Sequence, residues 1–504
     1  MTIKTKNREP WSWVTKEARR FMGKDYLGGS ETLEERVRVI ADGVQTEMNI
    51  PGLSDKIVDY TSRGWISFST PIWCNAFTNR GLPISCFGSY IEDSMESILT
   101  KASEIGMMSK IGGGTSAYFG GLRGRGSLIS TGGESFGSVH FMELFKTMSK
   151  IVSQGSTRRG SCAAYLPIDH VDIEEFLRIN STEHIIQDFS FGVSVTDQWL
   201  EEMESGDKVK RSLWTKIIKK RFETGYPYIL FSDTINTKKP DVYKDKDMKI
   251  FASNLCSEIM LPSTKEESFV CNLLSTNVRY FEEWKDTDLI EVCVMILDSI
   301  MSEFILKAKD IAFMKPAVTF AENHRALGVG VVGYHSFLQS KMIPFESLEA
   351  KYWNSQIFKT MKTAAYAASE KLASMFGEPP LLKGYGRRNT TLLAIAPTTS
   401  SSEIMGVSPG IEPYTANYSV SKLAKGNFTF KNSDLVNLLK EKGKNDSETW
   451  KDILIHGGSV AHVDYLTEEE KNHAYWYFDV LAARLELALK KLNIEYPISE
   501  IKKL

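Results

Sequence analysis

The run Leu327-Gly-Val-Gly-Val-Val-Gly-Tyr334 decides between a dinucleotide-binding fold and a fold in which this run is a buried strand. Its glycines fit the Gly-x-Gly-x-x-Gly fingerprint of dinucleotide-binding proteins, which would make the chain a nicotinamide-dependent oxidoreductase. That fingerprint lies between a strand and a helix. Here the preceding residues 322–325 are polar, and the glycines themselves lie within the apolar run. The pattern therefore favours an extended, buried segment, and the oxidoreductase stays as the weaker alternative.

On both sides of this run, helical and extended patterns alternate along the chain. Apolar residues recur every three or four positions, as in amphipathic helices, over 31–66, 137–153, 198–222, 284–308 and 350–376. Extended runs are found at 65–68, 226–231, 268–274, 327–334 and 391–396. This alternation predicts an α/β fold. We expect an N-terminal helical region over 1–66, one large α/β domain over 67–465 and a C-terminal helical segment over 466–504.

The composition excludes several classes of protein. The 504 residues include 61 Lys and Arg against 63 Asp and Glu, so no global field draws the chain to nucleic acid or to anionic membranes. The apolar stretches are shorter than a membrane span, and residues 1–6 contain no apolar signal region, so we expect a cytoplasmic protein. Six cysteines without a Cys-x-x-Cys pair predict neither a disulfide scaffold nor a metal site.

The segment Asn254-Leu-Cys256-Ser-Glu258 places an amide, a thiol and a carboxylate at alternate positions. On a strand, all three side chains would project from one face. Together they could hold a hydroxylated substrate, exchange a hydrogen atom or a proton with it and act as a general base. The alternative is a half-buried strand whose polar face meets solvent.

The same segment resembles the signature of class I ribonucleotide reductase large subunits, and other motifs match that family in the same order over about residues 60–470. They are Thr70-Pro71, Ser85-Cys86, Asp93-Ser-Met-Glu-Ser-Ile98, the glycine-rich 112–126 region, Ser153-Gln-Gly-x-x-Arg158, Phe269-Val-Cys-Asn-Leu273, Pro397-Thr-Thr-Ser-Ser401 and Gly410-Ile-Glu-Pro413. The resemblance implies a ten-stranded α/β barrel, complete in this chain or completed by another segment or chain. Within it, the 327–334 run resembles a barrel strand whose glycines allow close packing.

The resemblance also implies radical chemistry at three cysteines. Cys256 would become a transient thiyl radical that abstracts the ribose 3'-hydrogen, with Glu258 as the base on the 3'-hydroxyl and Asn254 bound to the substrate. Cys86 and Cys271 match the reducing pair, which donates two electrons as the 2'-hydroxyl leaves and ends as a disulfide. Taken singly, each cysteine would be interpreted as a buried structural residue.

Two nucleotide sites are implied in the same way. The substrate phosphate would lie on Pro397, Thr398, Thr399, Ser400 and Ser401, which on local sequence alone also suit a helix N-cap. Thr70, Ser85 and Gly114 would line the nucleoside part of the substrate. A deoxynucleoside triphosphate effector would bind Asp93, Arg123, Gln154 and Arg158, each of which alone would be a surface polar residue.

The implied partners are a ribonucleotide substrate, a metal-containing small subunit that supplies the radical, a thioredoxin- or glutaredoxin-like reductant and a second copy of the chain. We expect no cofactor bound in the chain itself. A class II enzyme would instead use adenosylcobalamin without a small subunit, and the Asn-Leu-Cys form favours class I.

Two features depart from the family pattern. The match starts beyond the regulatory module of many large subunits, so we expect no on/off control by dATP. Towards the other end, no adjacent tyrosine pair occurs, Tyr475-Trp-Tyr477 lies in a helical pattern, and no cysteine follows Cys293. A shortened subunit, one piece of a split enzyme, a differently activated variant and a nucleotide-binding regulatory paralogue therefore stay open.

Overall fold

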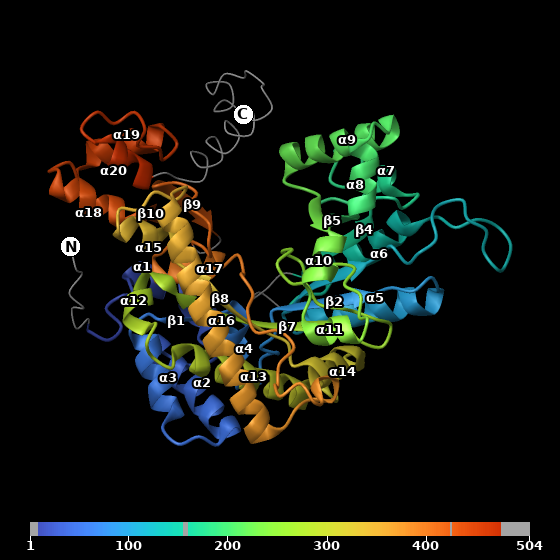
Figure 1. Cartoon of the computed structure of the whole chain (residues 1–504), viewed down its shortest axis with the longest axis horizontal. Helices are drawn as coiled ribbons and strands as arrows, with labels where there is room; N and C mark the ends of the chain where they lie inside the picture. The colour runs from blue at the N-terminus through green and yellow to red at the C-terminus, as the bar shows by residue number, and fades with distance from the viewer. Residues whose placement is uncertain (1–8, 155–159, 424–425, 475–504) are drawn as a thin grey trace.

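One eight-stranded sheet forms the centre of the structure, a computed structural model that describes residues 9–154, 160–423 and 426–474 (Figure 1). Five of its strands run parallel in chain order, each hydrogen-bonded to the next. These are β2 (Cys86–Tyr90), β3 (Gly114–Tyr118), β4 (Cys162–Pro167), β5 (Ser190–Val195) and β6 (Tyr228–Phe231). Helices in the connections between them make this half of the sheet a series of βαβ units, so the predicted α/β fold is confirmed.

Strand β7 (Phe269–Asn277) joins the two halves of the sheet, and all nine of its residues are buried. It runs antiparallel to β2 and to β1 (Ile66–Phe68), and parallel to β8 (Leu327–Val332) on its other side. Beyond β8, the predicted strand 391–396 is reduced to an isolated bridge between Val329 and Leu393. The described residues thus form an open, half-barrel sheet of eight strands, not the ten strands of the expected barrel.

The glycines of β8 lie inside the strand, as the sequence pattern favoured. A Cβ atom on Gly330 would lie 2.4 Å from the carbonyl oxygen of Ala394, and one on Gly328 would lie 2.8 Å from the Cβ of Ala394. Only glycine leaves room for the 391–396 segment to pack this closely. The motif therefore serves packing, and the prediction of a barrel strand is confirmed.

Helices surround the sheet. Those that fall in the ranges of predicted periodicity are α2 (Leu33–Met48), α3 (Leu53–Ser62), α6 (Ser138–Ile151), α13 (Leu289–Ala308) and α16 (Leu348–Phe376). Further helices are α1 (Lys16–Tyr26), α5 (Met95–Lys110), α14 (Lys315–His324) and α15 (Tyr334–Ser340). Shorter ones are α4 (Thr70–Asn75), α7 (Ile173–Phe176), α10 (Ser232–Lys238), α11 (Asp241–Asp245), α12 (Phe281–Trp284) and α17 (Thr399–Met405).

The range 198–222, for which helical periodicity was predicted, is helical and is divided between two helices. They are α8 (Asp197–Glu204) and α9 (Lys208–Thr224). Gly206 has a φ of 114°, which stops the first helix, and the Asp207 side chain accepts hydrogen bonds from the first amides of the second.

A second hydrophobic core lies in what we call the C-terminal lobe, residues 418–474, at the upper left of Figure 1. The lobe contains the hairpin β9 (Tyr418–Leu423) and β10 (Gly426–Lys431), followed by α18 (Ser433–Glu441), α19 (Ser447–Ile455) and α20 (Glu468–His473). A two-bonded ion pair between Arg279 and Asp434, at 2.6 and 2.8 Å, joins it to the barrel. None of the described helices combines the length and the apolar character needed to cross a bilayer.

Candidate active site

Cys86 on β2 and Cys271 on β7 are directly opposite each other in the antiparallel ladder. Opposed residues in such a ladder project from the same face, with Cα atoms about 4.5–5.5 Å apart. That separation lies within the range of about 4.4–6.8 Å that a disulfide spans. The fold therefore places two cysteines that are remote in sequence where they can exchange a disulfide for two thiols.

The segment 254–258 is a tight turn, so the strand predicted for it is wrong. Ser257 has a φ of 70°, and Oδ1 of the buried Asn254 side chain accepts hydrogen bonds from the amides of Glu258 (3.0 Å) and Ile259 (3.1 Å). Asparagine side chains compete in this way with backbone partners and stabilise turns. Cys256 lies exposed in this turn. We call residues 254–258 the Cys256 turn.

Asn254 also connects the Cys256 turn to the cysteine pair. Its Nδ2 donates to Sγ of Cys86 at 3.2 Å, while Oη of Tyr165 on β4 donates to its backbone carbonyl at 2.6 Å. The structure therefore brings Asn254, Cys86 and Cys271 together and holds the Cys256 turn beside them. Tyr165 is fully buried, and sequence reasoning missed it because it lies in an ordinary apolar strand.

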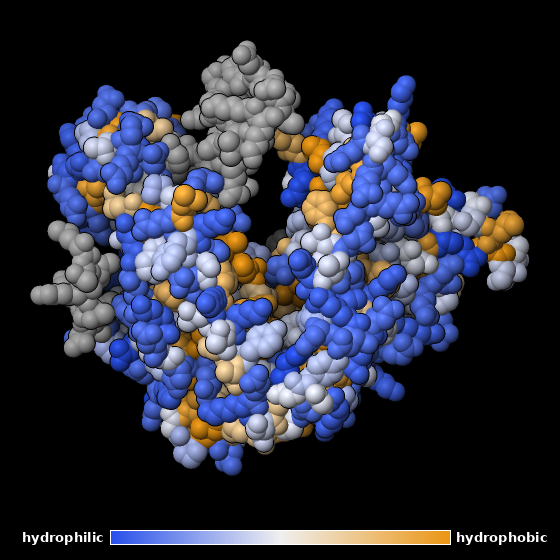
Figure 2. All heavy atoms as spheres, in the orientation of Figure 1, coloured by the Kyte–Doolittle hydropathy of each residue, from blue (hydrophilic) through white to orange (hydrophobic). Residues whose placement is uncertain are grey.

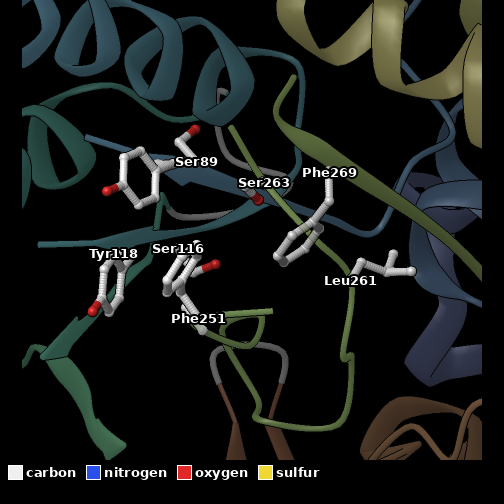
Figure 3. A pocket seen from close by; sticks show the side chains of 9 residues that line it. Ser89, Ser116, Tyr118, Phe251, Leu261, Ser263 and Phe269 are labelled. Carbon is white, nitrogen blue, oxygen red and sulfur yellow. The ribbon is translucent and has the colours of Figure 1, made fainter. Parts of the chain in front are cut away.

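The loop that contains the turn is anchored at both of its ends (Figure 3). The ring of Phe251 stacks on Tyr118 with centroids 5.1 Å apart, and Ser263 Oγ donates to the carbonyl of Gly88 at 3.0 Å. Phe251, Tyr118 and Ser263, with Phe269 and Leu261, line a small pocket. Since both anchors are on strands of the sheet, the position of the turn is set by the rigid part of the molecule.

Burial controls the ionisation of this cluster. It raises the pKa of the Glu258 carboxyl group, whose Oε2 is buried with no hydrogen-bond partner among the described residues. Burial also raises the pKa of the Cys271 thiol well above its usual range, and the charges of Cys86 and Glu258 raise it further. The cluster therefore offers a protonated Cys271 thiol and a carboxylate that takes up a proton readily.

The residues expected to line the nucleoside lie next to the turn. Ser85 precedes Cys86, its carbonyl accepts from the amide of Gly114 at 2.9 Å, and its Oγ lies 3.4 Å from Oγ of Ser69. Thr70 follows as the first residue of α4. A Cβ atom on Gly114 would lie 3.1 Å from a methyl group of Leu255, so glycine here leaves space beside the Cys256 turn.

The residues 397–401 lead into α17, close to the end of β1. Thr398 has a φ of 52°, and its Oγ1 accepts from the amide of Gly410 at 2.6 Å. Ser401 Oγ donates to the carbonyl of Phe68 in β1 at 3.5 Å. Because β1 pairs with β7, this hydroxyl-rich segment lies on the same part of the sheet as Cys271. Figure 2 shows the molecule hollowed here, with hydrophobic residues on the floor of the hollow.

The four residues expected at an effector site are not all brought together. Arg123 Nε donates to Asp93 at 2.7 Å, beyond the carboxyl ends of β2 and β3. Gln154 lies at the opposite ends of these strands, where its Nε2 donates to Asn75 Oδ1 at 3.0 Å. Its Oε1 fills the space that a side chain at Gly112 would occupy. Arg158 and the aromatic residues 475–477 lie outside the described residues.

Known proteins are similar to this chain in sequence and in fold. The family model described as ribonucleotide reductase, barrel domain, matches residues 84–210, 209–381 and 379–485. A putative ribonucleoside-diphosphate reductase large subunit of Frog virus 3 (isolate Goorha) is 34% identical over 441 residues, 84% of this chain and 77% of that protein. The corresponding large subunit of Invertebrate iridescent virus 3 is 32% identical over 500 residues, 83% of this chain and 78% of that protein. The solved Actinobacillus ureae class Id ribonucleotide reductase alpha subunit is 49% identical, with a TM-score of 0.88 over 94% of this chain and 87% of that chain.

Proposed function

Because the chain belongs to the class I ribonucleotide reductase large subunits, we propose that it reduces ribonucleoside diphosphates to deoxyribonucleotides by a thiyl-radical reaction at Cys256. The observation that supports this most directly is the cross-strand pair of Cys86 and Cys271, bonded through Asn254 to the Cys256 turn. A net two-electron reduction needs two thiols, and a radical step needs a third group that donates and recovers a hydrogen atom.

In the first half of the reaction, the Cys256 thiyl radical takes the hydrogen atom from C3' of the ribose, which leaves a thiol and a carbon radical at C3'. Glu258 accepts the proton of the 3'-hydroxyl group, a role for which the raised pKa of its buried carboxyl suits it. The 2'-hydroxyl group then leaves as water, with a proton supplied by the Cys86–Cys271 pair.

In the second half, one thiol of the pair delivers a hydrogen atom to C2', and the remaining electron passes to the 3'-oxygenated ribose radical as Glu258 returns its proton to the 3'-oxygen. The pair has then supplied two electrons and is a disulfide. Cys256 returns its hydrogen atom to C3', which regenerates the thiyl radical. The sum is one ribonucleotide and one dithiol converted into one deoxyribonucleotide, one disulfide and one water. The cross-strand register allows the disulfide to form with little movement of the two strands.

The proposed partners follow from this reaction. A separate, metal-containing small subunit supplies the radical, and a thioredoxin- or glutaredoxin-like protein reduces the disulfide. We place the substrate phosphates on 397–401 and the nucleoside beside Thr70, Ser85 and Gly114. For a deoxynucleoside triphosphate effector, the half-exposed Arg123 is the phosphate ligand that the structure favours, since phosphate can replace Asp93 as its partner.

The test measures conversion of a ribonucleoside diphosphate by the full chain with its small subunit and a dithiol reductant. Cys256→Ser should abolish turnover, while Cys293→Ser, at a buried cysteine in α13, should keep it. Without reductant, the pre-reduced chain should make about one product per chain. Full turnover by Cys256→Ser would exclude the radical role, and turnover with adenosylcobalamin in place of the small subunit would exclude class I.

A further inference from the structure

Three side chains of metal-ligating types meet on the surface of the C-terminal lobe. Asp452 lies on α19, His456 follows the end of that helix four residues later, and His462 comes from the loop beyond. One donor atom of each lies within 4.8 Å of the other two. His462 Nε2 is 2.6 Å from one carboxylate oxygen of Asp452, and His456 Nδ1 is 3.3 Å from the other.

The loop that presents His462 is positioned by other contacts than these. Gly457 and Gly458, with φ values of 68° and 92°, turn the chain back beside α19, and the carbonyl of Gly458 accepts from Asn417 Nδ2 at 3.0 Å. Val460 and Val463 are buried in the lobe's core. His462 therefore faces the helix because of packing, and the two imidazole rings stack with centroids 3.7 Å apart. The three groups are arranged in advance of any ligand.

The hydrogen bonding of His456 suits a coordinating imidazole. Its Nδ1 lies 2.9 Å from the backbone carbonyl of Asp452 and 3.3 Å from the carboxylate. A proton on Nδ1 directed at that carbonyl leaves the Nε2 lone pair as the ligand, whereas a proton on Nε2 leaves the Nδ1 lone pair beside the carboxylate. Two imidazoles and one carboxylate match Zn²⁺ and its transition-metal neighbours, whereas Mg²⁺ and Ca²⁺ prefer oxygen ligands alone. Zn²⁺ with three protein ligands completes its coordination with water.

We propose that Asp452, His456 and His462 bind one transition-metal ion, with Zn²⁺ as the best match. The ion joins the end of α19 to the loop 457–464. Cysteine spacing alone predicted no metal site, and this one is formed by histidines and an aspartate that the lobe's fold brings together. In Figure 1, α19 lies far from β2 and β7, so the site is separate from the candidate active site and does not depend on the proposed function.

The experiment titrates the chelator-treated full chain with ZnCl₂ in a calorimeter. Because thiols also bind zinc, the chain should contain Cys86→Ser, Cys256→Ser and Cys271→Ser. We expect one equivalent of Zn²⁺ to bind and MgCl₂ not to compete. His456→Gln and His462→Gln should each weaken binding by about tenfold or more. His140→Gln, at an exposed histidine on α6, is the matched control and should bind as the parent does.

Two further results bear on the proposal. With Co²⁺, the spectrum should lack a thiolate-to-metal charge-transfer band, and amide hydrogen exchange of 457–464 should slow on Zn²⁺ binding in the parent but not in His462→Gln. No Zn²⁺ binding, or equal affinity in the parent and both histidine variants, would overturn the site. Zinc binding without slower exchange would overturn its role in joining the loop to α19.

Discussion

Replacing Tyr165 by phenylalanine removes one hydroxyl group from beneath the Cys256 turn and leaves the aromatic ring in place. That hydroxyl donates to the carbonyl of Asn254 at 2.6 Å, and Tyr165 has no exposed surface. A buried carbonyl that loses its partner costs about 1–3 kcal/mol of stability. The Tyr165→Phe variant should therefore unfold at a lower denaturant concentration than the parent.

The effect on catalysis should be larger than the effect on stability. Asn254 is both the acceptor of this bond and the donor to Cys86, so the turn loses its fixed position relative to the cysteine pair. A misplacement of about 1 Å at a reacting group costs about 10²-fold in rate. We expect kcat to fall by about that factor with little change in KM, because the segment 397–401 and Thr70, Ser85 and Gly114, where we place the phosphates and the nucleoside, lie outside the turn.

The assay compares steady-state reduction and urea unfolding of Tyr165→Phe with those of Tyr334→Phe. Tyr334 is a matched control, because its buried hydroxyl also donates to a backbone carbonyl, that of Ala350, at 2.8 Å. Both variants should lose similar stability, and only the first should lose turnover. Equal kcat values for the two variants would refute the positioning role of Tyr165.

Three other substitutions test separate parts of the reasoning. Glu258→Gln should lower turnover by about 10²-fold or more. Because burial raises the pKa of Glu258 in the folded state, the parent loses stability as the pH rises through that pKa. In urea unfolding, the variant should therefore be more stable than the parent at pH 8 and equally stable near pH 4. Lys101→Met leaves the buried carboxylate of Glu104 without its 2.8 Å partner, and thermal unfolding should show that the free energy of unfolding falls by about 3–5 kcal/mol. The double variant Lys101→Met/Glu104→Leu should recover most of this loss, and no recovery would contradict the pairing. Arg36→Met removes three hydrogen bonds, at 2.7, 2.9 and 2.7 Å, to carbonyl groups at the end of α4, and should cost on the order of 3 kcal/mol; a change below about 0.5 kcal/mol, as at a surface site, would contradict this.

Local patterns in the sequence predicted the regular elements well. The apolar periodicity of 350–376 corresponds to α16, and the apolar run at 327–334 corresponds to β8. In both, the spacing of buried residues is a property of the element itself. The break near Gly206 was missed because the apolar spacing continues across it, although glycine followed by aspartate is a signal for a new helix start.

The arrangement of the site was harder to predict, because it depends on contacts between distant segments. The alternation of Asn254, Cys256 and Glu258 mimics a strand, whereas the buried amide of Asn254 folds the segment into a turn. Nothing local shows that Cys86 opposes Cys271, since this follows from the register of β2 on β7. Gln154 likewise lies at the far ends of the strands from Asp93 because of the sheet's direction, which no motif contains.

The opposed positions of Cys86 and Cys271 also determine how the reductant can distinguish the oxidised from the reduced enzyme. Two electrons are stored between residues whose backbones are already held by the ladder, so the reduced and oxidised barrels should have nearly the same shape. The oxidation state of the cysteine pair should therefore cause no conformational change in the core of the enzyme. We expect the reductant to find oxidised and reduced chains equally accessible, and to distinguish them only by reacting with the sulfur bond.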